Sequence, residues 1–106
     1  MGVLSVGDDL PVWGGGRRII YSIIEYAIGT IGERPYLTTL KESFDHGYNH
    51  ADLGALTRYE LSEFRNAAAS YARNIQWKRE GFKDCEELMQ ELLDLVDARL
   101  TQLTTH

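Results

Sequence analysis

The sequence predicts an all-α fold, a small bundle of about four helices preceded by an irregular arm over residues 1–16. Three observations support this prediction. The chain has 106 residues, which is enough for one compact domain spanning 1–106. Apolar residues recur at helical spacing in successive segments, each bounded by residue types that begin or end helices. Outside the arm, no alternation of apolar and polar residues indicates a strand.

The arm contains Pro11 and the glycine run 14–16, which disfavour a helix and predict a hinge. Its apolar residues allow either a short strand or an extended segment lying on the core: Val3, Leu4, Val6, Leu10, Val12 and Trp13. The first helix is predicted over about residues 17–31, where an almost all-round apolar surface is typical of a central helix. Gly32 ends it. This apolar run is too short for a bilayer, which needs about 20 residues, and Glu25 interrupts it.

The second helix is predicted to begin at Pro35, a residue favoured in a first turn because the N–H that it lacks would be unpaired there. Gly47 closes this helix. The segment 48–56 is ambiguous, because Asn49 or Asp52 allows a short helical turn to begin in it.

The third helix is predicted to begin at Thr57, since Thr57 and Glu60 have the spacing of a capping box, and to end at Gly81. The fourth begins near Asp84 and runs close to the C-terminus. Its buried side is marked by a leucine-rich set: Leu88, Met89, Leu92, Leu93, Leu95, Val96, Leu100 and Leu103.

The charge balance favours a protein partner over a nucleic acid. The chain has 11 Lys and Arg against 16 Asp and Glu, a net charge of −5, whereas binding to phosphate backbones is driven by basic side chains. A negative surface suits a basic protein instead. The single cysteine excludes an internal disulfide, and no signal peptide is evident, so we expect a reducing, cytoplasmic setting without a membrane anchor.

Acidic residues gather on one side of the predicted fourth helix. In projection one sector of about 140° holds Glu86, Glu87, Gln90, Glu91, Asp94, Asp97 and Thr101, and the leucines take the other side. We call Glu86, Glu87, Glu91, Asp94 and Asp97 the acidic ridge, and predict that it binds a partner. The alternative is an ordinary solvated face whose first acids complement the helix dipole. That alternative explains Asp94 and Asp97 less well, because like charges repel several turns along the helix.

A second group of acids, the middle acidic set, consists of Asp45, Asp52, Glu60 and Glu63. It lies near Tyr48 and Tyr59 in the sequence, and aromatic side chains beside charges suit an interface. We therefore add Asp45, Tyr48, Asp52, Tyr59 and Glu63 to the predicted partner-binding residues. Burial of Tyr48 against the core is the alternative, since it lies in a connection. Trp77 and Phe82 are further candidate anchors.

No residue pattern predicts catalysis, a metal or another cofactor. His46 and His50 are four residues apart, but Gly47 between them ends the helix and removes the shared face that a metal site needs. Cys85 is predicted to be a small buried apolar residue. An enzymatic alternative would rest on these three side chains. The segment 44–65 resembles a helix-turn-helix, but Glu60 and Glu63 stand where a recognition helix is usually basic, so no direct nucleic-acid contact is expected.

As a whole, the chain resembles the small acidic immunity proteins of bacterial toxin–immunity pairs, particularly those of contact-dependent growth inhibition. The resemblance rests on its short, acidic, single-domain character without a catalytic signature, and on the segment Tyr59-Glu60-Leu61-Ser62-Glu63-Phe64-Arg65. Such proteins share no common motif, so no family site maps onto particular residues here. The resemblance implies a cognate toxin domain as partner, often a basic nuclease and in several cases a tRNase, whose active site the immunity protein blocks. The alternative function is a small dimeric helical regulator or adaptor with nucleic-acid contacts, so monomer and dimer both stay open.

Overall fold

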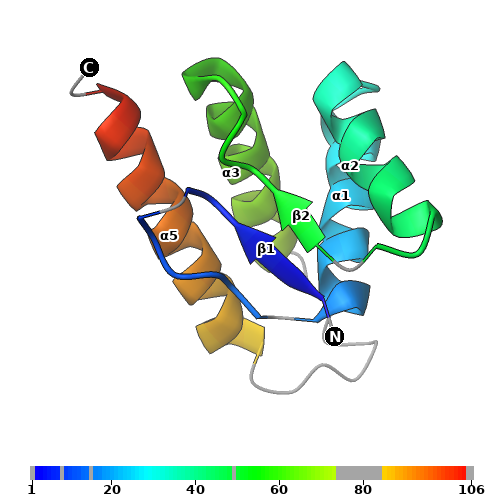
Figure 1. The fold of residues 1–106 in the computed structure, drawn as a ribbon, viewed down its shortest axis with the longest axis horizontal. Coiled ribbons are helices and arrows are strands. Elements are labelled where there is room, and N and C mark those ends of the chain that lie inside the picture. The colour runs from blue at the N-terminus through cyan, green and yellow to red at the C-terminus, as the bar shows by residue number, and fades with distance from the viewer. Residues whose placement is uncertain (1, 8, 15, 49, 74–84, 105–106) are drawn as a thin grey trace.

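The computed structural model describes residues 2–7, 9–14, 16–48, 50–73 and 85–104. In chain order its elements are β1 (Val3–Ser5), α1 (Arg17–Ile31), α2 (Pro35–Asp45), β2 (His50–Asp52), α3 (Arg58–Arg73) and α5 (Cys85–Thr104). The helices pack in the spatial order α2, α1, α3, α5, and the two strands lie across one face of them (Figure 1). The predicted small helical bundle with an N-terminal arm is confirmed.

The first helix occupies the centre that its apolar pattern predicted, between α2 and α3. Ile20, Ile23 and Ile24 are completely buried, as expected of a helix that is apolar on most sides. The helix ends where predicted because Gly32 adopts a φ of 103°, in the left-handed region that favours glycine. The N–H of Gly32 donates to the carbonyl of Ile28 at 2.9 Å, which satisfies an otherwise unpaired terminal group.

The predicted starts of the second and third helices agree with the structure. Pro35 is in the first turn of α2. The capping box before α3 is present, with the N–H of Thr57 donating to Glu60 Oε1 at 2.9 Å and the N–H of Glu60 donating to Thr57 Oγ1 at 3.2 Å. The predicted end of the third helix at Gly81 and the start of the fourth at Asp84 lie outside the described residues.

The arm contributes a strand, and its partner is a strand that the sequence analysis did not predict. β1 and β2 pair in parallel, with Val3 opposite His50 and Ser5 opposite Asp52. The expectation that strands are confined to the arm was therefore wrong. β2 has three residues, with Ala51 buried between the exposed His50 and Asp52, and an alternation this short does not predict a strand. Its extended conformation depends on β1 lying beside it.

The rest of the arm folds back along β1 and packs on α5. Leu4 and Trp13 exchange backbone hydrogen bonds, at 2.8 Å from the Leu4 N–H and 2.7 Å from the Trp13 N–H. The Trp13 side chain is 2% exposed, and its indole Nε1–H donates to the carbonyl of Leu88 in α5 at 2.8 Å. This hydrogen bond joins the arm to the helix that carries the acidic ridge.

A continuous apolar core joins the described elements. It includes Leu4 and Trp13 from the arm, Phe44 from α2, Phe64 from α3 and Leu92 from α5. Among the helices that the structure describes, none has both the length and the apolar character needed to cross a bilayer.

Candidate partner-binding surface

The central part of the acidic ridge is exposed on α5. Glu87, Glu91 and Asp94 follow one another at spacings of four and three residues, which puts them on one face of the helix, and all three are exposed. Gln90 donates a hydrogen bond to Asp94 at 2.9 Å. Within the described ranges, no Lys or Arg forms an ion pair with any of the three carboxylates. The side chain of Glu86 lies outside the described part of the chain.

Asp97, at the end of the ridge, has a different environment. Its carboxylate accepts two hydrogen bonds from Arg65 of α3, from Nε at 3.0 Å and from Nη2 at 3.4 Å. The two side chains are 49% and 36% exposed, so this ion pair joins α3 to α5 at the surface. The part of the ridge with unpaired carboxylates is therefore Glu87, Glu91 and Asp94, as far as the described residues show.

The carboxylates of Asp45 and Asp52 in the middle acidic set are exposed, but each accepts hydrogen bonds from other residues of this chain. Asp45, the last residue of α2, accepts a hydrogen bond from the Tyr21 hydroxyl of α1 at 2.9 Å. Asp52 of β2 accepts the N–H of Gly54 at 2.9 Å and the hydroxyl of Ser5 at 3.3 Å. The bond to Gly54 is an Asx turn that ends β2.

Glu60 and Glu63 also have internal roles. Glu60 completes the capping box of α3, as described above. Glu63 accepts a hydrogen bond from the Tyr36 hydroxyl at 3.2 Å and forms an ion pair with Arg34 at 3.4 Å. Burial, together with the negative charge of Glu63, raises the pKa of the Tyr36 phenol well above its usual range. The middle set is thus spread over α2, β2 and α3, and its carboxylates help to hold these elements together.

The two predicted interface tyrosines are at the surface. Tyr48 is 67% exposed and Tyr59 is 71% exposed, so the alternative in which Tyr48 is buried is wrong. Tyr59 lines a surface depression with Arg58 and Ser62 at the start of α3. The other two candidate anchors, Trp77 and Phe82, lie outside the described residues.

The histidines are placed on different elements. His46 follows the last residue of α2, while His50 begins β2, and among the described residues no group of His, Cys, Asp and Glu is arranged to hold a metal. His50 Nε2 lies 3.0 Å from Ser5 Oγ, and the hydroxyl of Ser5 donates a hydrogen bond to Asp52. In a nucleophilic triad the carboxylate would orient the imidazole, and here it binds the hydroxyl instead. This arrangement joins the two strands.

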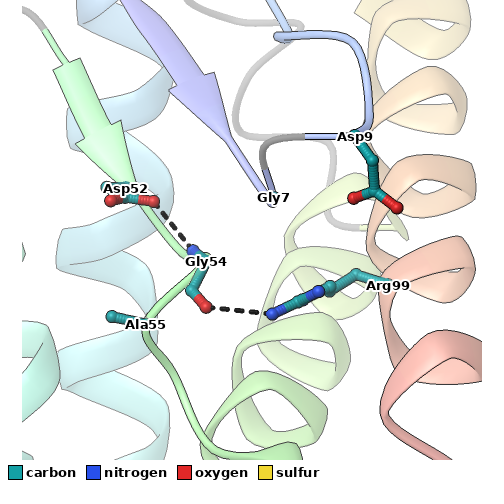
Figure 2. A pocket seen from close by; sticks show the side chains of 6 residues that line it. All are labelled: Gly7, Asp9, Asp52, Gly54, Ala55 and Arg99. Carbon is teal, nitrogen blue, oxygen red and sulfur yellow. Dashed lines mark hydrogen bonds between the residues drawn. The ribbon is translucent and has the colours of Figure 1, made fainter.

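A larger pocket, of about 430 Å³, lies where the arm, the turn after β2 and α5 meet (Figure 2). It is lined by Gly7, Asp9, Asp52, Gly54, Ala55 and Arg99. Arg99 donates to the carbonyl of Gly54 at 3.2 Å and to Gln102 at 3.1 Å, and Gln102 donates to Asp9 at 2.7 Å. Sequence reasoning missed this junction because its residues are up to 93 positions apart. Arg99 Nε is buried without a hydrogen-bond partner among the described residues, whereas the other polar groups of this network join the arm, the turn after β2 and α5.

The close approach of two backbones shapes this junction. A Cβ atom on Gly54 would lie 3.0 Å from Asp52 Oδ1 and 3.5 Å from the Cα of Gly7. The absence of a side chain at Gly54 therefore lets the turn after β2 pack against the arm. These two glycines were the only sequence signal for the contact.

Comparison of the chain with protein-family models, with curated proteins and with solved structures finds no match in any of the three. A functional proposal for the chain therefore rests on its own surface.

Proposed function

We propose that this chain is an immunity protein that binds a cognate nuclease-type toxin domain, with tRNases among the candidates, and neutralises it by covering its basic active-site cleft. The observation that supports this most directly is the exposed group Glu87, Glu91 and Asp94 on α5, which has no basic partner in the described part of the chain. The net charge of −5 adds a long-range attraction to a basic partner.

The chemistry of a nuclease explains why such a ridge would inhibit it. A nuclease must attract phosphates, so its cleft carries Lys and Arg. Carboxylates on a rigid helix can pair with those cations in place of the phosphates of the substrate. Opposite the ridge, Met89, Leu92 and Val96 are buried in the core, so the helix backbone that carries the carboxylates is held in place before binding. Charge attraction then raises the association rate, and short-range pairing adds specificity.

The alternative function, a small dimeric regulator or adaptor, needs an apolar surface for self-association. In the described residues, the large apolar side chains that are exposed are Val12, Tyr48 and Tyr59, and none of these belongs to α1 or α5. Light scattering over a range of concentrations tests this alternative. A dimer that persists on dilution would favour it, and a monomer throughout would count against it.

The test of the proposed function uses the candidate toxin domain, which we expect at the C-terminal end of a large protein encoded immediately upstream of this chain. Its nuclease activity is measured with increasing amounts of the chain, and binding kinetics are measured at low and high salt. The test variant is E87K/E91K/D94K. The matched control is E25K/E33K/E42K, which changes the net charge equally at exposed positions away from α5.

We expect the wild-type chain to abolish nuclease activity at about equimolar ratio. The ridge variant should associate at least about tenfold more slowly at low salt, with a smaller difference at high salt. The control should lose only the part of the rate that comes from net charge. Full nuclease activity in the presence of excess wild-type chain would disprove the proposal, and equal losses in the two variants would exclude the ridge as the contact surface.

A further inference from the structure

A groove lies beside the acidic ridge, between the arm and α5. Its volume is about 330 Å³. One wall is formed by residues 11–14 of the arm, and the other by Glu91, Asp94 and Leu95 of α5. The groove therefore shares two of its residues with the exposed part of the ridge.

The arm wall of this groove is fixed in position. Trp13 is buried beneath it, bonded through its indole to Leu88 of α5 and through its backbone to Leu4 of β1. The neighbouring Pro11 has a restricted backbone. A surface that is already ordered loses little conformational entropy when a partner binds.

The groove offers an apolar contact next to negative charge. Val12 is 60% exposed, although the next residue in the chain, Trp13, is almost completely buried. Single exposed apolar residues are common on protein surfaces. Val12 differs from Tyr48 and Tyr59 in lining the same groove as two carboxylates without a described basic partner.

These features define the chemistry of an occupant. An apolar side chain would cover Val12 and Leu95, but covering Glu91 and Asp94 without pairing them would cost free energy. A Lys or Arg next to that apolar side chain would remove this cost. A second copy of this chain does not fit, because a twofold contact would bring Glu91 and Asp94 of both copies together.

We infer that this groove is the anchor point for the partner, and that it receives an apolar side chain flanked by Lys or Arg in the partner chain. This inference rests on the proposed function for the identity of the partner, and on the groove alone for the chemistry of the contact. It places Val12 and Leu95 beside Glu91 and Asp94 as binding residues.

The experiment uses a peptide probe, so it does not depend on finding the toxin. The ¹⁵N-labelled chain is titrated with the acetylated, amidated peptide KRLKR, with KRSKR as the apolar control and EELEE as the charge control. The amides of Val12 and Leu95 and the indole N–H of Trp13 report on the groove. The expected result is that KRLKR shifts these signals, that KRSKR binds about tenfold more weakly, and that EELEE does not bind.

Two variants assign the contact to the groove. Val12→Ser should weaken KRLKR binding severalfold and leave KRSKR binding unchanged. Val12→Thr keeps the branched shape but replaces a methyl group by a hydroxyl, and it should weaken KRLKR binding in the same direction. E91Q/D94N should weaken the binding of both basic peptides. The control E33Q/E42Q, which removes the same charge at exposed positions outside the groove, should cause only the smaller loss that comes from net charge. The dispersion of each variant's spectrum verifies that it is folded.

Several results would overturn the inference. One is equal affinity for KRLKR and KRSKR, and another is a set of peptide-induced shifts that map away from the groove. A third is concentration-dependent broadening of the groove signals without peptide, which would indicate a second copy as occupant. Peptide binding in the groove without toxin binding would refute the proposed function alone. Toxin binding that is unaffected by Val12→Ser would refute the groove alone.

Discussion

The acidic ridge and the middle acidic set have similar residues but differ in the hydrogen bonds that their carboxylates make. In the middle set, Asp45, Asp52 and Glu63 each accept hydrogen bonds from residues far along the chain. On the ridge, Glu87 and Glu91 have no described basic partner. A run of carboxylates in a sequence is therefore not evidence of a binding surface. The residues that surround each carboxylate in the fold decide whether it stabilises the structure or remains available to a partner.

The largest effect that separates the two regions should come from removing one carboxylate of each. Glu63→Ala leaves the partly buried Tyr36 hydroxyl without its acceptor, which should lower the free energy of unfolding by about 1–3 kcal/mol. Glu91 also lies within a helix but is exposed, so Glu91→Ala should change the free energy of unfolding by less than about 0.5 kcal/mol. Urea denaturation of both variants measures the difference. Equal losses would mean that the ridge, too, stabilises the fold.

The next effect is a loss of stability at high pH that originates at Tyr36, whose phenol is desolvated by burial and bonded to Glu63 of the middle set. Because the pKa of Tyr36 is raised in the folded chain, the folded state keeps a proton that the unfolded state loses above about pH 10. The stabilisation is complete below that pH and falls as the pH rises, by at most about 1.4 kcal/mol per pH unit. Denaturation from pH 8 to 11 measures the slope. Tyr36→Phe should flatten it, and an unchanged slope in that variant would contradict this origin.

A smaller effect concerns Glu60, whose role in the middle set is to cap a helix. Thr57→Ala removes one half of the capping box, which should destabilise the chain by about 1 kcal/mol. Thermal unfolding followed by circular dichroism measures the change. Ser at position 57 retains a hydroxyl and is the matched control, so a similar loss in Thr57→Ser would argue against a capping effect.

The smallest effect is expected at Asp97, which belongs to the ridge in sequence but is paired like the middle set. Its ion pair with Arg65 is partly exposed, so the coupling energy in a double-mutant cycle of Arg65→Ala and Asp97→Ala should be below about 1 kcal/mol and should decrease with added salt. A larger, salt-independent coupling energy would mean that Asp97 stabilises the fold as Glu63 does.

The helical part of the fold could be predicted from the sequence because its signals are local. The isoleucine spacing of α1, the proline that begins α2 and the capping box of α3 each lie within a few residues of the structure that they specify. The strand β2 could not be predicted from local signals, since it pairs with β1, whose residues lie 47 positions earlier.

The candidate site could be predicted only in part. The one-sided placement of Glu87, Glu91 and Asp94 follows from helical periodicity alone. The partners of Glu63 and Asp97 come from other helices, about thirty residues away, so no local pattern separates these acids from the unpaired ones. The groove was missed because Val12 becomes a neighbour of Leu95 only when the arm packs on α5.

The anchoring of the arm has a consequence for the order in which the chain folds. The indole of Trp13 bonds a carbonyl 75 positions later, and Asp9 bonds a side chain 93 positions later. Contacts across such long stretches carry a large loop-closure entropy, whereas helices form from local contacts. We therefore expect the arm to dock late, after residues 85–104 have been synthesised, so that the surface built jointly by the arm and α5 is assembled in one of the last folding steps.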